Sequence, residues 1–268
     1  MGYAPIGRQG ETVKRLHIVG CPRSGTTLLM ELISTCFYSD GFCEHEKSIF
    51  QPLEQHLEPE LYFTKQPNDI KQLHHIFNKD DNLFVIYSGR DPRAVISSKH
   101  RESPDQYFCN YRVWSESDRA AQHYEGHPRF MSLRYEDLVL NANQVQRSMV
   151  EQFPFLQTRH LFSEFSEFAR PSSASRRAMN GLREVNADSL EKWRDHLPRV
   201  AQQYRQHPAL AEDLCRLGYE PDKRWAQILD DVQPQVYPCR YPDKKPLWKD
   251  WEKSLRVYFK SRQYLKNL

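Results

Sequence analysis

The segment Gly20-Cys-Pro-Arg-Ser-Gly25-Thr26-Thr27 restricts the fold of this chain more than any other feature of the sequence. It follows residues 13–19 (VKRLHIV), which predict a β-strand that ends in Gly20, and it precedes apolar residues at helical spacing. A glycine-containing turn from a strand into a helix nearly matches the GxxxxGK[ST] phosphate loop, whose backbone N–H groups and helix N-terminus bind an anion. The sequence therefore predicts an anion-binding turn at the end of a buried strand.

This turn differs from an ATP-binding loop at one position. Thr26 stands where the motif has lysine, and the nearest cation is Arg23, inside the turn. The lysine of an NTPase contacts the β- and γ-phosphates, so its absence weakens the case for ATP. The backbone N–H groups and the hydroxyls of Thr26 and Thr27 remain available to an anion. The alternative interpretation is an ordinary strand-to-helix turn with a threonine as its cap.

Strands alternate with helices from residue 13 to about residue 155. This alternation is typical of a doubly wound parallel sheet flanked by helices, so we predict an α/β fold of the P-loop-like kind. The predicted strands are 13–19, 61–65, 83–87 and 130–134, and the predicted helices run from Thr26, around 70–77, from Pro92, over 107–124 and over 143–153.

The second half of the chain is harder to interpret. Residues 158–185 are polar and predict a long loop, and Asp188 with Glu191 forms a capping box that predicts a helix start. Residues 233–268 combine prolines, aromatic residues and charges, which predicts an irregular C-terminal tail. We therefore divide the chain into a domain over 1–232 and an extension over 233–268 that packs on it.

Composition excludes several classes of protein. The 38 basic and 35 acidic residues give a net charge of only +3, too small for a nucleic-acid-binding protein but compatible with a local cationic pocket. The six cysteines show no paired spacing and no metal-ligand pattern, so we expect reduced thiols, no metal and a cytoplasmic protein. No apolar run approaches the ~20 residues of a membrane span, and the N-terminus has no apolar signal region.

A second candidate anion site follows the strand over 83–87. In Gly89-Arg90-Asp91-Pro92, Asp91 suits the N-cap and Pro92 the first turn of a helix. Ligands of open α/β sheets bind at the carboxyl ends of the strands, which would place Arg90 beside the first turn. Ser98 lies where its hydroxyl could reach the same phosphate; the alternative is a surface salt bridge between Arg90 and Asp91. Together the two sites predict a nucleoside ligand with phosphates at both ends.

The segments CPRSGTTLL and RDPRAVISS together resemble the sulfotransferases that use 3′-phosphoadenosine 5′-phosphosulfate (PAPS). Tyr135-Glu-Asp-Leu-Val139 and parts of 185–221 are similar to the tyrosylprotein sulfotransferase branch of that family. The resemblance covers about residues 15–222. It implies PAPS as the cofactor and a hydroxyl-bearing acceptor, which the sequence leaves open among a tyrosine peptide, a sugar, a lipid and a small molecule.

The resemblance also assigns the residues that would bind PAPS. The first turn would hold the 5′-phosphosulfate, and Arg90 with Ser98 would hold the 3′-phosphate. Arg183 stands where the family usually has lysine. The implied cofactor-binding residues are Arg23, Ser24, Gly25, Thr26, Thr27, Arg90, Ser98, Tyr135, Arg183 and Lys192.

In addition to Arg23, the resemblance assigns two residues to catalysis. Lys65, in Lys65-Gln-Pro67, is similar to the family's segment with a catalytic lysine; the alternative is a lysine at a strand edge. Counting from Cys43, Glu46 matches the general base of the tyrosylprotein branch. Glu44 and His45 are rivals because each is chemically competent as a base, and the whole segment could instead be a solvated loop.

Two other functions remain open at this point. A P-loop kinase would use ATP and Mg²⁺, but it would need the lysine that Thr26 replaces and an acidic residue at the end of an apolar strand. A nucleotide-binding protein without catalysis would keep the two anion sites and lose the roles of Glu46 and Lys65.

Overall fold

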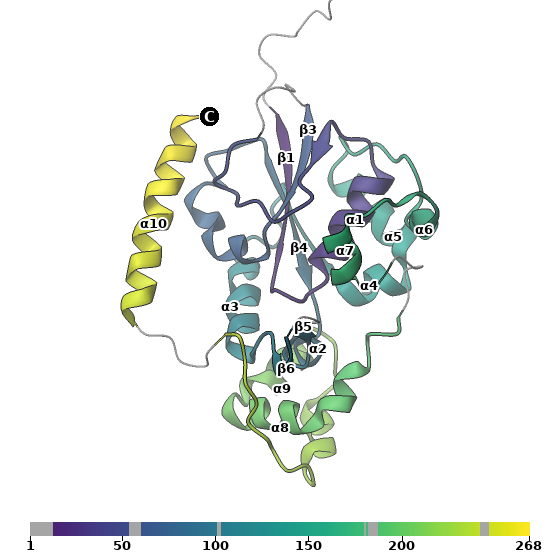
Figure 1. Cartoon of the computed structure of the whole chain (residues 1–268), viewed down its shortest axis with the longest axis vertical. Coiled ribbons are helices and arrows are strands. Elements are labelled where there is room, and N and C mark those ends of the chain that lie inside the picture. Colours follow the sequence, from purple (N-terminus) through teal and green to yellow (C-terminus); the bar gives the residue numbers. More distant parts are fainter. Residues whose placement is uncertain (1–12, 54–59, 101–102, 180, 182–186, 242–246) are drawn as a thin grey trace, which may run out of the picture.

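The computed structural model describes residues 13–53, 60–100, 103–179, 181, 187–241 and 247–268. A five-stranded parallel sheet of order β2-β3-β1-β4-β7 lies at its centre (Figure 1). The α/β class predicted from the sequence is therefore confirmed. The strands are β1 (Lys14–Gly20), β2 (Gly41–Phe42), β3 (Leu61–Lys65), β4 (Leu83–Gly89) and β7 (Phe130–Arg134).

The register of the sheet fixes which chain segments meet. β1 pairs on one side with β3, placing Ile18 opposite Lys65, and on the other with β4, placing Gly20 opposite Ser88. Six of the seven β1 residues are buried, as expected of a central strand covered on both faces. The carboxyl ends of β1, β3 and β4 consequently lie at one edge of the sheet, where their loops can form a common site.

Helices cover both faces of the sheet and extend below it (Figure 1). The α-helices are α1 (Thr26–Cys36), α2 (Pro92–Ile96), α3 (Tyr111–Gln122), α4 (Tyr135–Leu140), α5 (Ala142–Gln152), α6 (Phe165–Phe168), α7 (Ser173–Ala178), α8 (Leu197–Gln206), α9 (Ala209–Arg216) and α10 (Leu247–Lys266). The 3₁₀-helices are η1 (Pro67–His75), η2 (Phe162–Glu164), η3 (Lys192–His196) and η4 (Lys223–Leu229), and a small hairpin pairs β5 (Lys99–His100) with β6 (Ser103–Tyr107).

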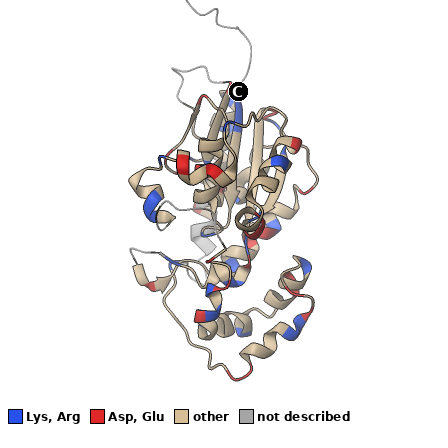
Figure 2. Ribbon diagram, turned by 90° about the vertical axis from the view of Figure 1, so that its right-hand side faces the viewer, with Lys and Arg blue, Asp and Glu red and all other residues tan. Residues whose placement is uncertain are grey.

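Three apolar clusters form the core. One packs α1 and α5 against the sheet, a second packs η1 and α3 against the opposite face, and a third joins α2, α3, α8 and α9. Basic and acidic residues are mixed along the ribbon (Figure 2), in keeping with the small net charge. No helix in the described part of the chain is long and apolar enough to cross a membrane.

Several boundaries predicted from the sequence are wrong. The helix predicted around 70–77 is a 3₁₀-helix, η1, and α3 begins at Tyr111 because the Asn110 side chain caps it by accepting from the Val113 N–H. Residues 158–185 contain η2, α6 and α7, since Phe162 and Phe165 are buried against the core. The capping box at Asp188 does not start a helix: η3 begins at Lys192, and α8 follows with a proline in its first turn.

The predicted irregular tail is also wrong in its last part. Residues 247–266 form α10, a 20-residue helix that runs alongside η1 (Figure 1). All four prolines of residues 233–268 precede Leu247, so nothing in the remaining segment interrupts a helix. The inner face of α10 buries Val257 and Ser261, and Tyr264 donates a hydrogen bond to Asp80.

A buried arginine connects the sheet to the loop after β2. The Arg15 guanidinium donates to Thr64 Oγ1 on β3 at 2.8 Å and to the carbonyl oxygens of Ile49 and Ser48 at 2.7 and 3.0 Å. Asp69 accepts from the Ile49 N–H, and burial lowers the pKa of Arg15. These bonds fasten residues 48–51, and hence the segment just before them, to β1 and β3.

We expect Arg15→Met to lower the free energy of unfolding by about 2–4 kcal/mol, because each buried carbonyl left without a donor costs about 1–3 kcal/mol. Urea denaturation followed by circular dichroism measures the change. The control is Lys14→Met at the neighbouring exposed position, which should stay within about 0.5 kcal/mol of the parent. Equal denaturation midpoints for the two variants would contradict the fastening role of Arg15.

Candidate functional site

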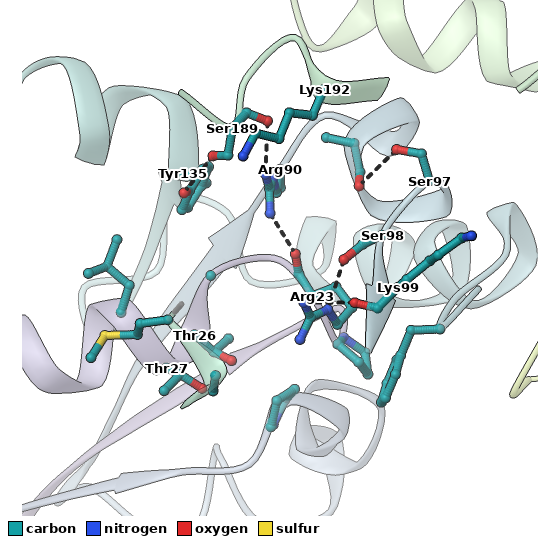
Figure 3. Close-up of a pocket in the computed structure, with 18 of the residues that line it drawn as sticks. Arg23, Thr26, Thr27, Arg90, Ser97, Ser98, Lys99, Tyr135, Ser189 and Lys192 are labelled. Carbon is teal, nitrogen blue, oxygen red and sulfur yellow. Dashed lines mark hydrogen bonds between the residues drawn. The ribbon is translucent and has the colours of Figure 1, made fainter. Parts of the chain in front are cut away.

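A cavity of about 440 Å³ opens at the carboxyl edge of the sheet. The turn between β1 and α1, helix α2 with the residues after it, the start of α4 and the segment around η3 contribute its walls (Figure 3). Both anion sites predicted from the sequence therefore face one cavity. Its aromatic lining comes from Phe108, Tyr135, Phe165 and Trp193.

The first turn has an unusual backbone. Arg23 has φ 76° and Gly25 has φ 89°, both in the left-handed region that favours glycine. A Cβ atom on Gly25 would lie 2.3 Å from the Tyr135 ring, so only glycine fits between the turn and α4. At Arg23 this backbone is held by contacts of both its side chain and its carbonyl. The Arg23 Nε donates to Ser98 Oγ at 2.9 Å, and its Nη2 donates to the Lys99 carbonyl at 3.2 Å.

The two predicted anion sites are joined by a direct hydrogen bond. Arg90 Nη1 donates to the Arg23 carbonyl at 3.1 Å, and Arg90 Nη2 donates to the Ser189 carbonyl at 3.4 Å. The Arg90 guanidinium also lies over the Tyr135 ring, 4.2 Å from its centroid. The alternative interpretation of a salt bridge with Asp91 is wrong, because Asp91 pairs with Arg93 at 2.7 Å.

Positive charge is concentrated in this cavity. Its lining contains Arg23, Arg90, Lys99 and Lys192, against Glu46 as the one carboxylate among the lining residues of the described chain. Burial, and after it the charge of Arg90, lowers the pKa of Arg23. Because both effects disfavour the charged guanidinium, a bound anion would relieve them.

Lys65 lies beside the first turn, at the end of β3. Its Nζ donates to Thr27 Oγ1 at 2.9 Å, and the residue is only 7% exposed. The alternative interpretation, a lysine at an exposed strand edge, is therefore wrong. Burial lowers the pKa of Lys65, while the charges of Glu46 and Glu31 oppose this shift.

The segment with the three candidate bases lies next to Lys65. The Lys47 N–H donates to the Lys65 carbonyl at 2.9 Å, which fixes this segment against the end of β3. All three side chains are exposed, but Glu46 lines the cavity, whereas Glu44 and His45 are not among its lining residues. The geometry therefore favours Glu46 over its two rivals, and its role as a base stays a prediction.

The other predicted residues divide into three groups. Most of them lie on the cavity wall. Ser24 is buried, and its carbonyl accepts a hydrogen bond from Ser88 Oγ. Arg183 lies outside the described residues. Ser175, a possible further hydroxyl, is buried and is not among the lining residues. The predicted residues on the wall are Arg23, Gly25, Thr26, Thr27, Glu46, Arg90, Ser98, Tyr135 and Lys192.

The sequence did not single out several residues of the wall. The Ser189 hydroxyl hydrogen-bonds the Tyr135 hydroxyl at 2.9 Å, and its carbonyl accepts from Arg90. Ser189 lies inside the segment interpreted as a capping box, so no sequence pattern pointed to this contact. Lys99 could have been found from its place next to Ser98. The remaining lining residues that were missed include Ser97, Phe108 and His196.

The site fits an extended anionic ligand. The guanidinium of Arg90 carries five N–H donors, and its hydrogen bonds to the Arg23 and Ser189 carbonyls use two of them, so donors remain for a ligand oxygen. The cavity volume lies within the usual ~300–1,000 Å³ of small-molecule sites. No group of three or more His, Cys, Asp or Glu side chains that could hold a metal occurs in the part of the chain that the structure describes.

Comparisons with known proteins find similarity to solved structures alone. No protein-family model matches the chain, and neither does any curated protein. Mouse sulfotransferase SULT7A1 complexed with PAP is 13% identical, with a TM-score of 0.47 and coverage of 80% of this chain and 88% of that one. The sulfotransferase domain of the Synechococcus PCC 7002 olefin synthase is 16% identical, with a TM-score of 0.44 and coverage of 70% and 90%.

A third similar structure, the sulfotransferase domain from the curacin biosynthetic pathway, is 15% identical with a TM-score of 0.36 and coverage of 70% and 98%. Likeness at these scores does not establish a shared fold or activity. The α/β class of this chain rests on its own parallel sheet. Nothing in the comparisons tests the tyrosylprotein branch suggested by the sequence, which stays a prediction.

Proposed function

We propose that this protein is a sulfotransferase that moves the sulfuryl group of PAPS to a hydroxyl on an acceptor. The observation that supports this proposal most is the pair Arg23 and Arg90, which are joined by a hydrogen bond and line one cavity with Glu46. Lys65 is not a lining residue but lies next to the cavity, bonded to the lining residue Thr27. Two separated cationic groups suit a nucleotide with anions at both ends, and a lysine with a carboxylate suits group transfer to a hydroxyl.

The described residues would divide the binding of PAPS between two walls. The N-terminus of α1, with Arg23, Thr26 and Thr27, would hold the 5′ end through N–H groups, hydroxyls and the helix dipole. Arg90 would hold the 3′-phosphate through the guanidinium N–H groups that its two carbonyl contacts leave over, with Ser98 beside it. Lys192 and Tyr135 would complete the pocket, and Arg183 would join them as the resemblance implies.

Lys65 and Glu46 would carry the chemical step. When bound, PAPS supplies the sulfuryl group and a phosphate leaving group. The Lys65 ammonium would neutralise the charge that develops on the leaving oxygen, and its hydrogen bond to Thr27 fixes it against the first turn. Glu46 would accept the proton of the acceptor hydroxyl, which makes that oxygen the nucleophile.

The two alternative functions have less support. A kinase would need a cation at the position of Thr26 and an acidic residue for Mg²⁺, while the one carboxylate among the described lining residues is Glu46. A nucleotide-binding protein without catalysis would use Lys65 for binding alone and would give no role to Glu46 on the cavity wall.

The acceptor is proposed as a hydroxyl compound: a tyrosine peptide, a sugar, a lipid or a small molecule. We place the reaction in the cytoplasm, without metal and without nucleic acid. Six free cysteines, among them the buried Cys21, Cys36 and Cys109, support a reducing compartment.

The first prediction concerns the cofactor. 3′-Phosphoadenosine 5′-phosphate (PAP) should raise the melting temperature strongly, because a ligand at 100 times its Kd adds about 2.7 kcal/mol to stability. ADP, which lacks the 3′-phosphate, should do much less. Thermal denaturation with each nucleotide at equal concentration measures the difference. Stabilisation by ATP without any response to PAP would exclude the sulfotransferase and favour the kinase.

The second prediction concerns Arg90. Arg90→Ala removes a charge-assisted contact worth about 1.5–3 kcal/mol, so PAP should bind about 10–150-fold more weakly. A 5′-phosphate ligand without the 3′ group should bind almost as before. Isothermal titration with both ligands measures the two affinities, and Arg224→Ala at an exposed site is the control. An equal loss for both ligands would show that Arg90 acts through the Arg23 turn and not on a 3′-phosphate.

The third prediction separates binding from catalysis. Glu46→Gln keeps the shape of the side chain, so PAP affinity should hardly change while kcat falls about 10²–10⁴-fold, the usual contribution of a general base. Glu44→Gln and His45→Asn are matched controls on the same segment and should retain near-parent turnover. A large loss of kcat in either control, with a near-parent Glu46 variant, would transfer the role to that neighbour.

A further inference from the structure

Helix α10 exposes an apolar stripe on the side away from the sheet. Trp251, Leu255, Tyr258 and Phe259 are 69%, 40%, 45% and 67% exposed. Their spacing of i, i+4, i+7 and i+8 places them along one face of the helix. We call these four residues the α10 stripe. Four large apolar side chains on one exposed face are unusual for a surface helix and mark an interaction site.

The stripe is held on a fixed support. The opposite face of α10 buries Val257 and Ser261. Tyr264 donates a hydrogen bond to Asp80, and its ring meets the Phe50 ring edge-on at 6.5 Å between centroids. Packing therefore fixes the rotation of the helix, so the stripe faces outward as a consequence of the fold.

A cationic cleft lies beside the stripe. It measures about 490 Å³ and runs between η1 with the residues after it and the last turns of α10. The titratable lining residues other than Tyr258 are all Lys, Arg or His, with no Asp or Glu among the lining residues in the described part of the chain: His74, His75, Lys79, Arg262 and Lys266. Tyr258 belongs to both the cleft and the stripe. Burial, followed by the charges of His74 and Lys79, lowers the pKa of His75, which reflects the concentration of positive charge.

The charge of α10 decides which occupant fits. Residues 247–266 contain six Lys or Arg and two Asp or Glu, so two copies of this helix brought together through their stripes would repel each other. The surface of an anionic bilayer fits both features: the apolar side chains can insert between its lipids, and its negative headgroups attract the basic side chains. A basic amphipathic helix with Trp and Phe on its apolar side is the usual form of a helix that lies in a membrane interface.

We propose that α10 docks this protein on the surface of a bilayer that contains anionic lipids. The α10 stripe enters the boundary between headgroups and acyl chains, and the cationic cleft receives the phosphate or carboxylate of a headgroup. The helix lies in the plane of the interface and does not span the membrane. This inference is independent of the activity proposed above, because none of its residues belongs to the candidate functional site.

The test is co-sedimentation of the full chain with vesicles of phosphatidylcholine, with and without phosphatidylserine. We expect binding only with the anionic lipid, weakening as salt increases. Trp251→Ser with Phe259→Ser should lower the affinity by more than about tenfold by removing apolar burial. Arg262→Gln with Lys266→Gln should lower it about 25-fold, since each basic residue near an anionic surface contributes about fivefold.

Matched controls lie far from α10. Leu140→Ser removes a 58% exposed apolar side chain at the end of α4, and Lys223→Gln with Arg224→Gln removes two exposed charges on η4. Both should bind like the parent, and every variant should keep the parent melting temperature. Equal binding to neutral vesicles, equal losses in the controls, or no vesicle binding would overturn the proposal. So would a concentration-dependent dimer that the Trp251 and Phe259 changes abolish, because it would assign the stripe to a second copy.

Discussion

Parallel pairing of β1 with both β3 and β4 is the constraint on which the rest of this structure depends. The register sets Gly20 level with the end of β4 and Ile18 level with Lys65, so three chain segments far apart in sequence end at one edge. Backbone hydrogen bonds and the burial of β1 on both faces maintain that register, and a shift of one residue would turn Lys65 to the other face of the sheet. The chemistry proposed here therefore rests on strand pairing before it rests on any single side chain.

The site combines groups that would repel each other in isolation. Arg23 and Arg90 are held together because each has a structural partner: Ser98 for the side chain of Arg23, and the Arg23 carbonyl with the Tyr135 ring for Arg90. Burial makes the remaining positive charge costly and thereby increases the gain from a bound anion. Another buried arginine, Arg15, also has a structural role near the site. Its hydrogen bonds to the carbonyls of Ser48 and Ile49 hold the segment that contains Glu46 against β3.

The sequence predicted those parts of the fold that local pattern determines. The four predicted strands agree with β1, β3, β4 and β7, and Asp91 caps α2 as its sequence suggests, because apolar runs and N-cap chemistry act over a few residues. It failed where distant contacts decide: α10 forms beyond the last proline against η1, and Ser189 gains its place from Arg90 and Tyr135. The structure gathers most of the predicted site residues at one cavity, whereas their roles in binding and catalysis stay predictions.

The hydrogen bond from Arg90 to the Arg23 carbonyl has a consequence for which ligands the cavity can accept. Arg90 bonds the backbone of Arg23, and the side chain of Arg23 bonds Ser98, so the protein itself holds the two guanidinium groups at a set spacing. A molecule whose two anionic groups lie at a different separation could bind one of the two guanidinium groups and would leave the other without an anion. For the proposed cofactor, selectivity among nucleotides would then depend on length: the site would favour a ligand whose two anions lie at this distance, and the part between them would mainly have to span it.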